Sequence, residues 1–266
     1  MNARGAAGSR NAPHAEGMPA SDVSPCLDIL GIPVLAATTQ EAIRLIDRRC
    51  AAGQPFGVAF LNAHGSNLAA RDSGFAGTLR GMLVLNDGVG VDIAAHLLAG
   101  RRFPDNLNGT DFLPAFLSTT TQDHSVFLLG GRPGVATRAA SVIARDHPRH
   151  RLAGSRHGYF SPAETSDVVD EIRASGATVL LVALGNPAQE LWIRDNLAGT
   201  GVAVAFGVGA LFDFLAGEAV RAPAFIRRTR LEWAWRLILE PRRLFRRYVL
   251  GNPLFLLRVI GRRLAG

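Results

Sequence analysis

Lysine does not occur in the 266-residue sequence, and all 29 basic residues are arginine. A P-loop NTPase requires a lysine against the phosphates of its nucleotide, and a Schiff-base enzyme requires a reactive amine, so both classes are excluded. The two cysteines, Cys26 and Cys50, are too few for a disulfide framework and lack the paired spacing of a zinc site. The motifs HExxH, GxGxxG and GxSxG are also missing, so the sequence gives no sign of a zinc protease, a dinucleotide-binding enzyme or a serine hydrolase.

Long apolar runs are missing as well. The longest ones, at 179–185 and 249–261, are shorter than the ~18–20 residues that cross a bilayer or are broken by Gly, Pro and Arg. We therefore expect no transmembrane helix. The first 25 residues are rich in Ala, Gly, Ser and Pro without a continuous apolar run, which predicts a disordered tail at 1–25 rather than a signal peptide.

Positive charge is concentrated at the C-terminal end of the chain. Residues 221–266 contain 12 arginines and two glutamates, a net charge of +10, whereas residues 1–220 contain 17 arginines and 20 acidic residues, a net charge of −3. The C-terminal segment is also rich in leucine and aromatic residues. A basic and apolar segment of this kind is typical of binding to an anionic surface, either lipid head groups or nucleic acid.

Apolar, strand-like runs alternate with helical stretches between residues 26 and 220. The runs lie at 29–35, 56–62, 82–86, 125–130, 151–154, 178–184 and 202–206. Thr38 with Glu41, and Ser161 with Glu164, have the spacing of capping boxes and predict helix starts. Parallel strands need crossover helices, so this pattern predicts an α/β domain at 26–220 whose mainly parallel sheet is covered on both faces. From 221 to 266 we expect helices only, with Pro241 and Pro253 at first helical positions.

Candidate binding residues follow the predicted strands, because ligands of open α/β sheets bind beyond the carboxyl ends of the strands. Asp87 could act there as a general base, or it could cap the next helix. Gly130 and Gly131 either hold a phosphate at a helix N-terminus or form a tight turn without a ligand. Asp111 stands in the first turn of a predicted helix, where a carboxylate stabilises the helix dipole.

Three arginines of the C-terminal segment have helical spacing. Arg243 and Arg246 lie 7 and 10 residues after Arg236, which places the three on roughly one face if the helix continues through Pro241. Three guanidinium groups on one face suit a diphosphate, although a solvated basic face has the same pattern. The apolar residues between them serve either to dock the segment on the domain or to lie in a membrane interface.

Several segments together resemble the WecG/TagA/CpsF family of bacterial glycosyltransferases. The resemblance runs from about residue 28 to 257 and depends on the order and spacing of DILGIPV, NDGVGVD, NGTDF, VFLLGGRPGVA, AGSRHGYF, LVALGNPAQELWI, FGVGALFDFLAG and RAPAFIRRTRLEWAWRLILEPRRLFRRY. It implies a modified Rossmann-like domain and a C-terminal appendage that binds the membrane and completes the active site. It also implies inverting, metal-independent transfer without a cofactor, from a UDP-sugar to an undecaprenyl-diphosphate-linked saccharide at the cytoplasmic face of the plasma membrane.

The resemblance also assigns roles to residues. Asp87 matches the family's catalytic aspartate, which would take the proton from the acceptor hydroxyl, and Asn62 matches the family's strand-end asparagine near the acceptor or donor sugar. Arg236, Arg243 and Arg246 match arginines that neutralise the departing UDP or the lipid diphosphate. The other expected substrate-binding residues are Gly88, Gly109, Asp111, Gly130, Gly131, Tyr159, Gly185, Gln189, Glu190, Gly209 and Asp213. The partners implied are the donor, the acceptor glycan and an anionic membrane, with no nucleic acid.

The sequence leaves the donor sugar open among glucose, N-acetylmannosamine and N-acetylmannosaminuronate. Phe60 stands where teichoic-acid members have threonine, and Asn106 stands where many members have arginine. The segment NLNGTDF is more similar to exopolysaccharide glucosyltransferases of the family than to its N-acetylmannosaminyltransferases. The oligomeric state also stays open, with a homo-oligomer among the options. Two other hypotheses are a Rossmann-like oxidoreductase or epimerase that binds NAD or a nucleotide-sugar, and a non-catalytic basic module. For the glycosyltransferase, we expect a protein that lacks residues 221–266 to fold and bind UDP.

Overall fold

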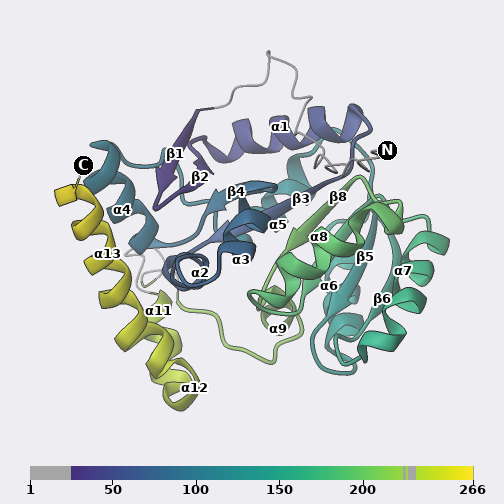
Figure 1. The fold of residues 1–266 in the computed structure, drawn as a ribbon. Coiled ribbons are helices and arrows are strands. Elements are labelled where there is room, and N and C mark those ends of the chain that lie inside the picture. The colour runs from purple at the N-terminus through teal and green to yellow at the C-terminus, as the bar shows by residue number, and fades with distance from the viewer. Residues whose placement is uncertain (1–24, 224–225, 227–231, 266) are drawn as a thin grey trace, which may run out of the picture.

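A parallel sheet of six strands lies at the centre of the computed structural model, which describes residues 25–223, 226 and 232–265 (Figure 1). Its strands are, in spatial order, β4 (Leu83–Asn86), β3 (Phe56–Leu61), β8 (Val204–Gly207), β7 (Val179–Ala183), β5 (Ser125–Gly130) and β6 (Arg151–Arg156). All neighbouring strands pair in parallel, so the predicted α/β class is confirmed. The predicted tail falls almost entirely on residues 1–24, which lie outside the described residues.

The run at 29–35, predicted as one strand, is instead part of a hairpin. Strands β1 (Cys26–Ile29) and β2 (Ile32–Leu35) pair antiparallel, and β2 contacts β4. The turn between them consists of Leu30 and Gly31, whose φ angles are 53° and 87°. Glycine adopts such a positive φ without steric cost, which is why the chain can reverse here.

Helices cover both faces of the sheet. On one face lie α1 (Thr39–Ala51), α5 (Gly109–Thr119), α6 (Val135–Asp146) and α9 (Leu211–Leu215). On the other lie α2 (Ala63–Ala69), α3 (Ser73–Arg80), α4 (Val89–Ala99), α7 (Thr165–Ala174) and α8 (Ala188–Thr200). Strand β3 shows why both faces are apolar: Val58 and Phe60 join one core cluster, while Ala59 and Leu61 join the other.

Both predicted capping boxes are confirmed. Thr38 accepts a hydrogen bond from the backbone N–H of Glu41 at the start of α1, and the Glu41 carboxylate accepts one from the N–H of Thr38. Ser161 and Glu164 form the same box, but they open the short 3₁₀ turn η1 (Pro162–Glu164) that precedes α7.

The secondary structure elements described in the C-terminal segment are all helical. They are α11 (Glu232–Leu239), α12 (Pro241–Phe245), the π-helical turn η2 (Arg246–Leu250) and α13 (Gly251–Ala265). Pro241 begins α12 as predicted, whereas Pro253 is the third residue of α13 and not the first. Within the described ranges, no helix has the length and apolar character needed to cross a membrane. The boundary at residue 220 stays a prediction.

Helix α13 lies against α2 and α4 and shares their core (Figure 1). Phe255 and Val259 are 0% exposed and belong to the same apolar cluster as β1, β2, α2, α3 and α4. Asn67 of α2 donates a hydrogen bond to the carbonyl oxygen of Gly251 at 2.7 Å, and Arg258 donates to Asn67. This packing argues against the expectation that the protein folds without residues 221–266, because the deletion would expose that cluster to water.

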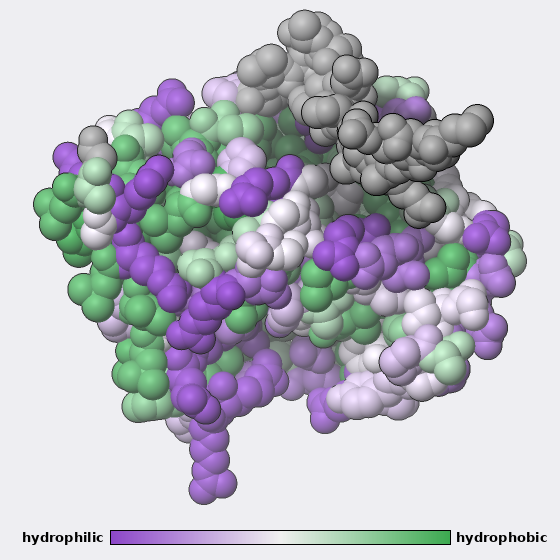
Figure 2. All heavy atoms as spheres, viewed as in Figure 1, coloured by the Kyte–Doolittle hydropathy of each residue, from purple (hydrophilic) through white to green (hydrophobic). Residues whose placement is uncertain are grey.

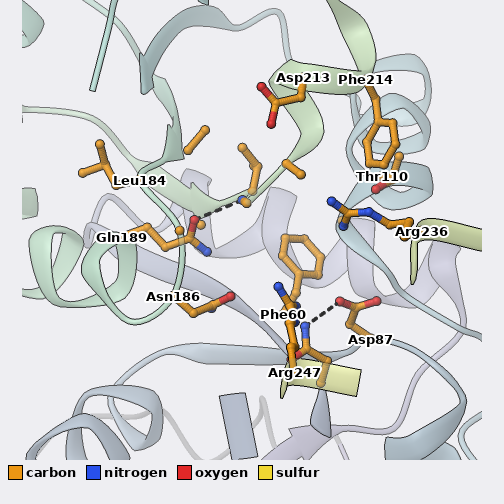
Figure 3. Close-up of a pocket in the computed structure, with 18 of the residues that line it drawn as sticks. Phe60, Asp87, Thr110, Leu184, Asn186, Gln189, Asp213, Phe214, Arg236 and Arg247 are labelled. Carbon is orange, nitrogen blue, oxygen red and sulfur yellow. Dashed lines mark hydrogen bonds between the residues drawn. The ribbon is translucent and has the colours of Figure 1, made fainter. Parts of the chain in front are cut away.

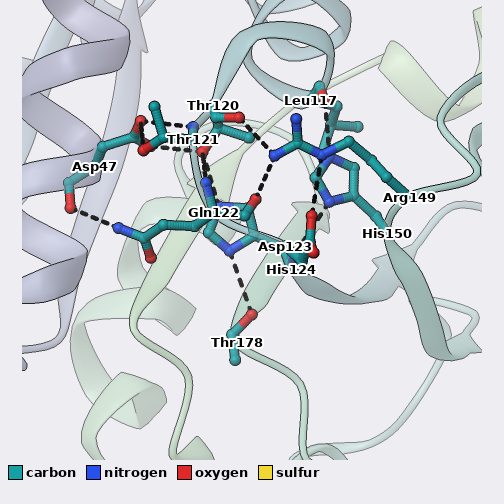
Figure 4. Close-up of polar contacts among 10 residues, drawn as sticks. All are labelled: Asp47, Leu117, Thr120, Thr121, Gln122, Asp123, His124, Arg149, His150 and Thr178. Atoms are coloured by element: carbon teal, nitrogen blue, oxygen red, sulfur yellow. Dashed lines mark hydrogen bonds and ion pairs between the residues drawn. The ribbon is translucent and has the colours of Figure 1, made fainter.

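A buried polar cluster joins the amino ends of β5 and β6, at the edge of the sheet opposite the strand ends that carry the site residues (Figure 4). His124 and His150 are 4% and 5% exposed, and their rings stack at 5.6 Å. The backbone N–H of His124 donates to Nδ1 of His150, and Thr120, which contacts Nε2 of His124, donates to Asp47. Burial, and to a smaller extent the neighbouring His150, lower the pKa of His124 to about 4. Protonation of this imidazole therefore works against the native structure.

Candidate active site

Asn62 and Asp87 meet at the carboxyl ends of the adjacent strands β3 and β4. The register pairs Leu61 with Asn86, so the residues that follow them lie side by side. Asn62 donates from Nδ2 to Oδ2 of Asp87 at 3.1 Å, while its Oδ1 accepts from the backbone N–H of Gly65 and caps α2. The cap fixes the amide so that its N–H₂ group faces the carboxylate.

Asp87 does not cap the helix that follows it. The N-cap of α4 is Gly88, with a φ of 90° and no side-chain hydrogen bond to the helix. Burial raises the pKa of Asp87, and the hydrogen bond from Asn62 and the charges of Arg247 and Arg236 oppose that rise in part. A carboxylate whose pKa is raised is a stronger base than an ordinary aspartate, so this group is suited to remove a proton.

Asp87 lines a cavity of about 330 Å³ at the carboxyl ends of the strands, which we name the strand-end cavity (Figure 3). Seven other predicted residues line it with Asn62 and Asp87 or stand at its rim: Gly109, Gly185, Gln189, Gly209, Asp213, Arg236 and Arg243. A Cβ atom on Gly109 would lie 3.2 Å from the Phe60 ring, and one on Gly207 would lie 2.9 Å from Nε2 of Gln189. The backbone at Gly109 and Gly207 thus lies close to these side chains, and the absence of a Cβ atom at both positions keeps the cavity open.

A second cavity of about 650 Å³, named here the tail groove, runs from Asp87 under the C-terminal helices. The predicted residues Gly88 and Asp111 line it. Its other wall is mostly apolar and includes Ile93, Trp233, Leu237, Tyr248, Val249, Pro253, Phe255 and Leu256. The two cavities share Asn62, Asp87, Thr110, Phe214, Arg236 and Arg247, so the carboxylate of Asp87 lies where they meet.

Arg246, predicted to reach the site, lines neither cavity, and Arg247 lines both. The helical spacing used for the prediction assumes one continuous α-helix, but a new helix begins at Pro241 and η2 is a π-helical turn. Both features change the rotation of the residues that follow. Only the adjacency of Arg246 and Arg247 in the sequence could have indicated that Arg247 lines the cavities instead.

Arg236 and Arg243 are held by Glu240. Arg243 lies 2.8 Å from one oxygen of that carboxylate, and Arg236 lies 3.9 Å from the other. The Arg236 guanidinium also lies over the Phe214 ring at 5.3 Å. With Arg247 they bring three cations from one helical segment to the rim of a cavity that is otherwise lined by backbone and neutral side chains, apart from Asp87 and Asp213.

Besides Arg246, four predicted residues lie outside both cavities. Gly130 and Gly131 form a tight turn after β5, where Gly131 donates to the carbonyl oxygen of Ala183. A Cβ atom on Gly130 would overlap the backbone of Ala183, so packing alone explains this glycine. Tyr159 is 68% exposed, and Glu190 is 0% exposed behind the cavity wall. Their positions in the sequence show that these residues follow strands, but not whether their side chains face the cavity.

The cavities also contain residues that the sequence did not single out. Thr110, Leu184, Asn186 and Phe214 line the strand-end cavity beside the predicted glycines (Figure 3). Asn186 was within reach of prediction, because it is the polar residue of the segment GNPAQE directly after β7. Phe214 follows the predicted Asp213 in the short helix α9, but an apolar side chain carries no signal that separates a cavity wall from the core.

A comparison with protein families matches residues 27–266 to the Glycosyl transferase WecG/TagA/CpsF family. The chain belongs to this family. Membership of the WecG/TagA/CpsF family supports glycosyl transfer as the activity, with a sugar donor and a glycan acceptor, in the synthesis of cell-surface polysaccharide. Among the described residues, no group of three or more His, Cys, Asp or Glu side chains could hold a metal ion. Metal-independent transfer stays a prediction.

Proposed function

We propose that the chain transfers a hexose or N-acetylhexosamine from a UDP-sugar to an undecaprenyl-diphosphate-linked saccharide, with inversion at the anomeric carbon. The observation that supports this most is the position of Asp87 between two cavities of different character. The strand-end cavity has polar walls and three arginines, which suit a nucleotide diphosphate. The tail groove has a largely apolar wall, which suits a polyprenyl chain next to its sugar.

In this proposal Asp87 is the general base. It accepts the proton of an acceptor hydroxyl while that oxygen forms a bond to the anomeric carbon of the donor. The bond between that carbon and UDP breaks on the opposite side, and the electron pair leaves with the β-phosphate oxygen. Arg236, Arg243 and Arg247 neutralise the charge that develops there. Asn62 holds the carboxylate of Asp87 in place through the hydrogen bond from its Nδ2.

We also propose that the C-terminal helices attach the enzyme to the cytoplasmic face of the plasma membrane. Large apolar side chains are exposed along them: Ile238, Leu239, Phe245, Val249, Leu250, Leu257, Ile260 and Leu264. Figure 2 shows hydrophobic residues at the left edge, where Figure 1 places α13, with hydrophilic side chains beside them. Apolar residues with arginines between them suit an anionic lipid surface. Each basic residue near such a surface contributes on the order of 1 kcal/mol to the free energy of binding.

The first test is transfer from a panel of UDP-sugars to polyprenyl-diphosphate acceptors, with EDTA present. We expect turnover with one donor, and we expect Asp87→Asn to reduce kcat by about 10²–10⁴-fold, the usual contribution of a general base. UDP affinity should change little in that variant. The matched control is Asp167→Asn, the same change at an exposed position in the first turn of α7. An Asp87→Asn protein with full turnover would refute the assignment of the base.

A further inference from the structure

Glu190 is a buried carboxyl group that touches no cavity but holds two residues that do. It is 0% exposed on α8. Its Oε1 accepts hydrogen bonds from Nδ2 of Asn186 at 2.5 Å and from Nε2 of Gln189 at 2.8 Å. Asn186 and Gln189 both line the strand-end cavity (Figure 3).

The carboxyl group fixes the orientation of both amides. An amide turned by 180° would place its carbonyl oxygen against a carboxyl oxygen, which is unfavourable, so each must direct its N–H₂ group at Glu190. For Gln189, this leaves Oε1 free to accept from the backbone N–H of Gly209, at 3.0 Å. For Asn186, it leaves Oδ1 on the cavity side, and that oxygen has no hydrogen-bond partner among the residues that the structure describes.

Glu190 is costly for the fold in the absence of such a role. Its second oxygen, Oε2, is buried without a hydrogen-bond partner among the described residues. Burial raises the pKa of the group to about 7. A buried, half-satisfied carboxyl group destabilises a core relative to an apolar side chain of similar size. Its arrangement is explained if the orientation of the two amides matters for binding.

We propose that Glu190 is a positioning residue, which orients Asn186 so that its Oδ1 accepts a hydrogen bond from an N–H or O–H group of the nucleotide-sugar donor. This inference depends on the proposed function, because it takes the strand-end cavity as the donor site. Uracil offers an imide N–H group and the sugar offers hydroxyl groups, and both supply the donor that the Asn186 oxygen requires. Glu190 itself touches neither the substrate nor the reacting atoms.

A double-mutant cycle tests the role. Asn186→Ala, Glu190→Met and the double variant are compared for the KM of the active UDP-sugar, for kcat, and for dissociation constants of UDP and of that UDP-sugar. We expect each single change to raise KM about tenfold, as the loss of one hydrogen bond does, with a smaller change in kcat. The double variant should be no worse than Asn186→Ala alone, because Glu190 acts through Asn186.

Two further variants separate positioning from folding. Glu190→Gln retains a carbonyl oxygen that can accept from both amides, so it should recover most of the lost donor affinity. Glu171→Met replaces an exposed glutamate of α7 and is the matched control. If the Glu190→Met protein melts earlier but has an unchanged KM, the role is structural and the proposal is wrong. The proposal would also be wrong if the increase in KM of the double variant equalled the product of the increases in the two single variants.

The binding arms identify the group that is recognised. Equal loss of affinity for UDP and for the UDP-sugar in Asn186→Ala supports recognition of the uracil imide, whereas loss for the UDP-sugar alone supports a sugar hydroxyl. Unchanged affinity for both overturns the role of Glu190 while leaving the proposed function intact. A wild-type protein that is folded but neither binds UDP nor transfers sugar overturns the proposed function itself.

Discussion

Replacement of Phe255 by alanine should destabilise the whole protein and not only its C-terminal helix. Phe255 is 0% exposed, although it belongs to α13, and it joins the cluster formed by β1, β2, α2, α3 and α4. A Cβ atom on Gly90 of α4 would lie 3.7 Å from its ring. The position between two helices and the sheet leaves little room for the site to collapse, so we expect a cost of about 3–5 kcal/mol, the usual range for Phe→Ala in a core.

This cost is a large part of the total stability, which for globular proteins is about 5–15 kcal/mol. In a domain of this size each kcal/mol lowers Tm by about 2–4 °C, so Phe255→Ala should lower it by about 10 °C. The assay is urea and thermal unfolding followed by circular dichroism and by tryptophan fluorescence. Trp192 of α8 is buried in a core cluster away from α13, so its signal reports on the sheet once Trp233 and Trp235 of α11 are replaced by phenylalanine.

The control is Leu264→Ala on the same helix, where the side chain is 83% exposed and the expected change is within about 0.5 kcal/mol. If α13 were an independent unit, Phe255→Ala would shift only a small, separate transition and leave the unfolding of the sheet unchanged. That result would refute the shared core. A protein that ends at residue 250, remains monodisperse and unfolds like the wild type would refute it as well.

Two further predictions concern charge. His124 has a native pKa of about 4, below its ordinary 6.5, so its contribution to stability is present above pH 6.5 and is lost as the pH falls toward 4. In urea unfolding, lowering the pH from 7.5 to 5 should therefore cost the wild type about 2 kcal/mol more of its unfolding free energy than it costs His124→Gln. Equal losses in the two proteins would contradict the prediction. The charge of Arg247 lowers the pKa of Asp87. Arg247→Gln should therefore move the acidic limb of the kcat–pH profile to higher pH and reduce kcat, whereas Arg246→Gln, outside both cavities, should leave the profile in place.

The sequence predicts the sheet well because the signals for its strands and helix starts are local. Fully buried strands such as β5 and β7 are continuous apolar runs, and the Thr38 and Ser161 boxes need only a four-residue window. Asn62 and Asp87 were within reach for the same reason. They follow strands, and parallel strands place their carboxyl ends at one edge of the sheet.

What the sequence did not predict depends on rotation or on contacts between distant segments. Arg247 lines both cavities and Arg246 neither, because a helix start at Pro241 and a π-helical turn interrupt the period of 3.6 residues that the prediction assumed. Glu190 was expected to bind substrate because of the family resemblance, but α8 turns its side chain away from the cavity. The hydrogen bond between Asn67 and Gly251 joins residues 184 positions apart, and neither residue has a local pattern that would reveal it.

The docking of α13 connects the surface proposed to bind the membrane with the proposed active site. One side of this helix places Phe255 and Val259 in the core, while Leu257, Ile260 and Leu264 remain exposed. The turn before it places Arg247 beside Asp87, and Phe255 and Leu256 form part of the tail groove. Lipid that binds the exposed side therefore meets a helix that is already packed against α2 and α4. In the proposed function, the lipid surface therefore has only to bring the acceptor to a groove whose walls are already formed. We expect high salt to release the enzyme from vesicles without changing its turnover of a soluble acceptor analogue.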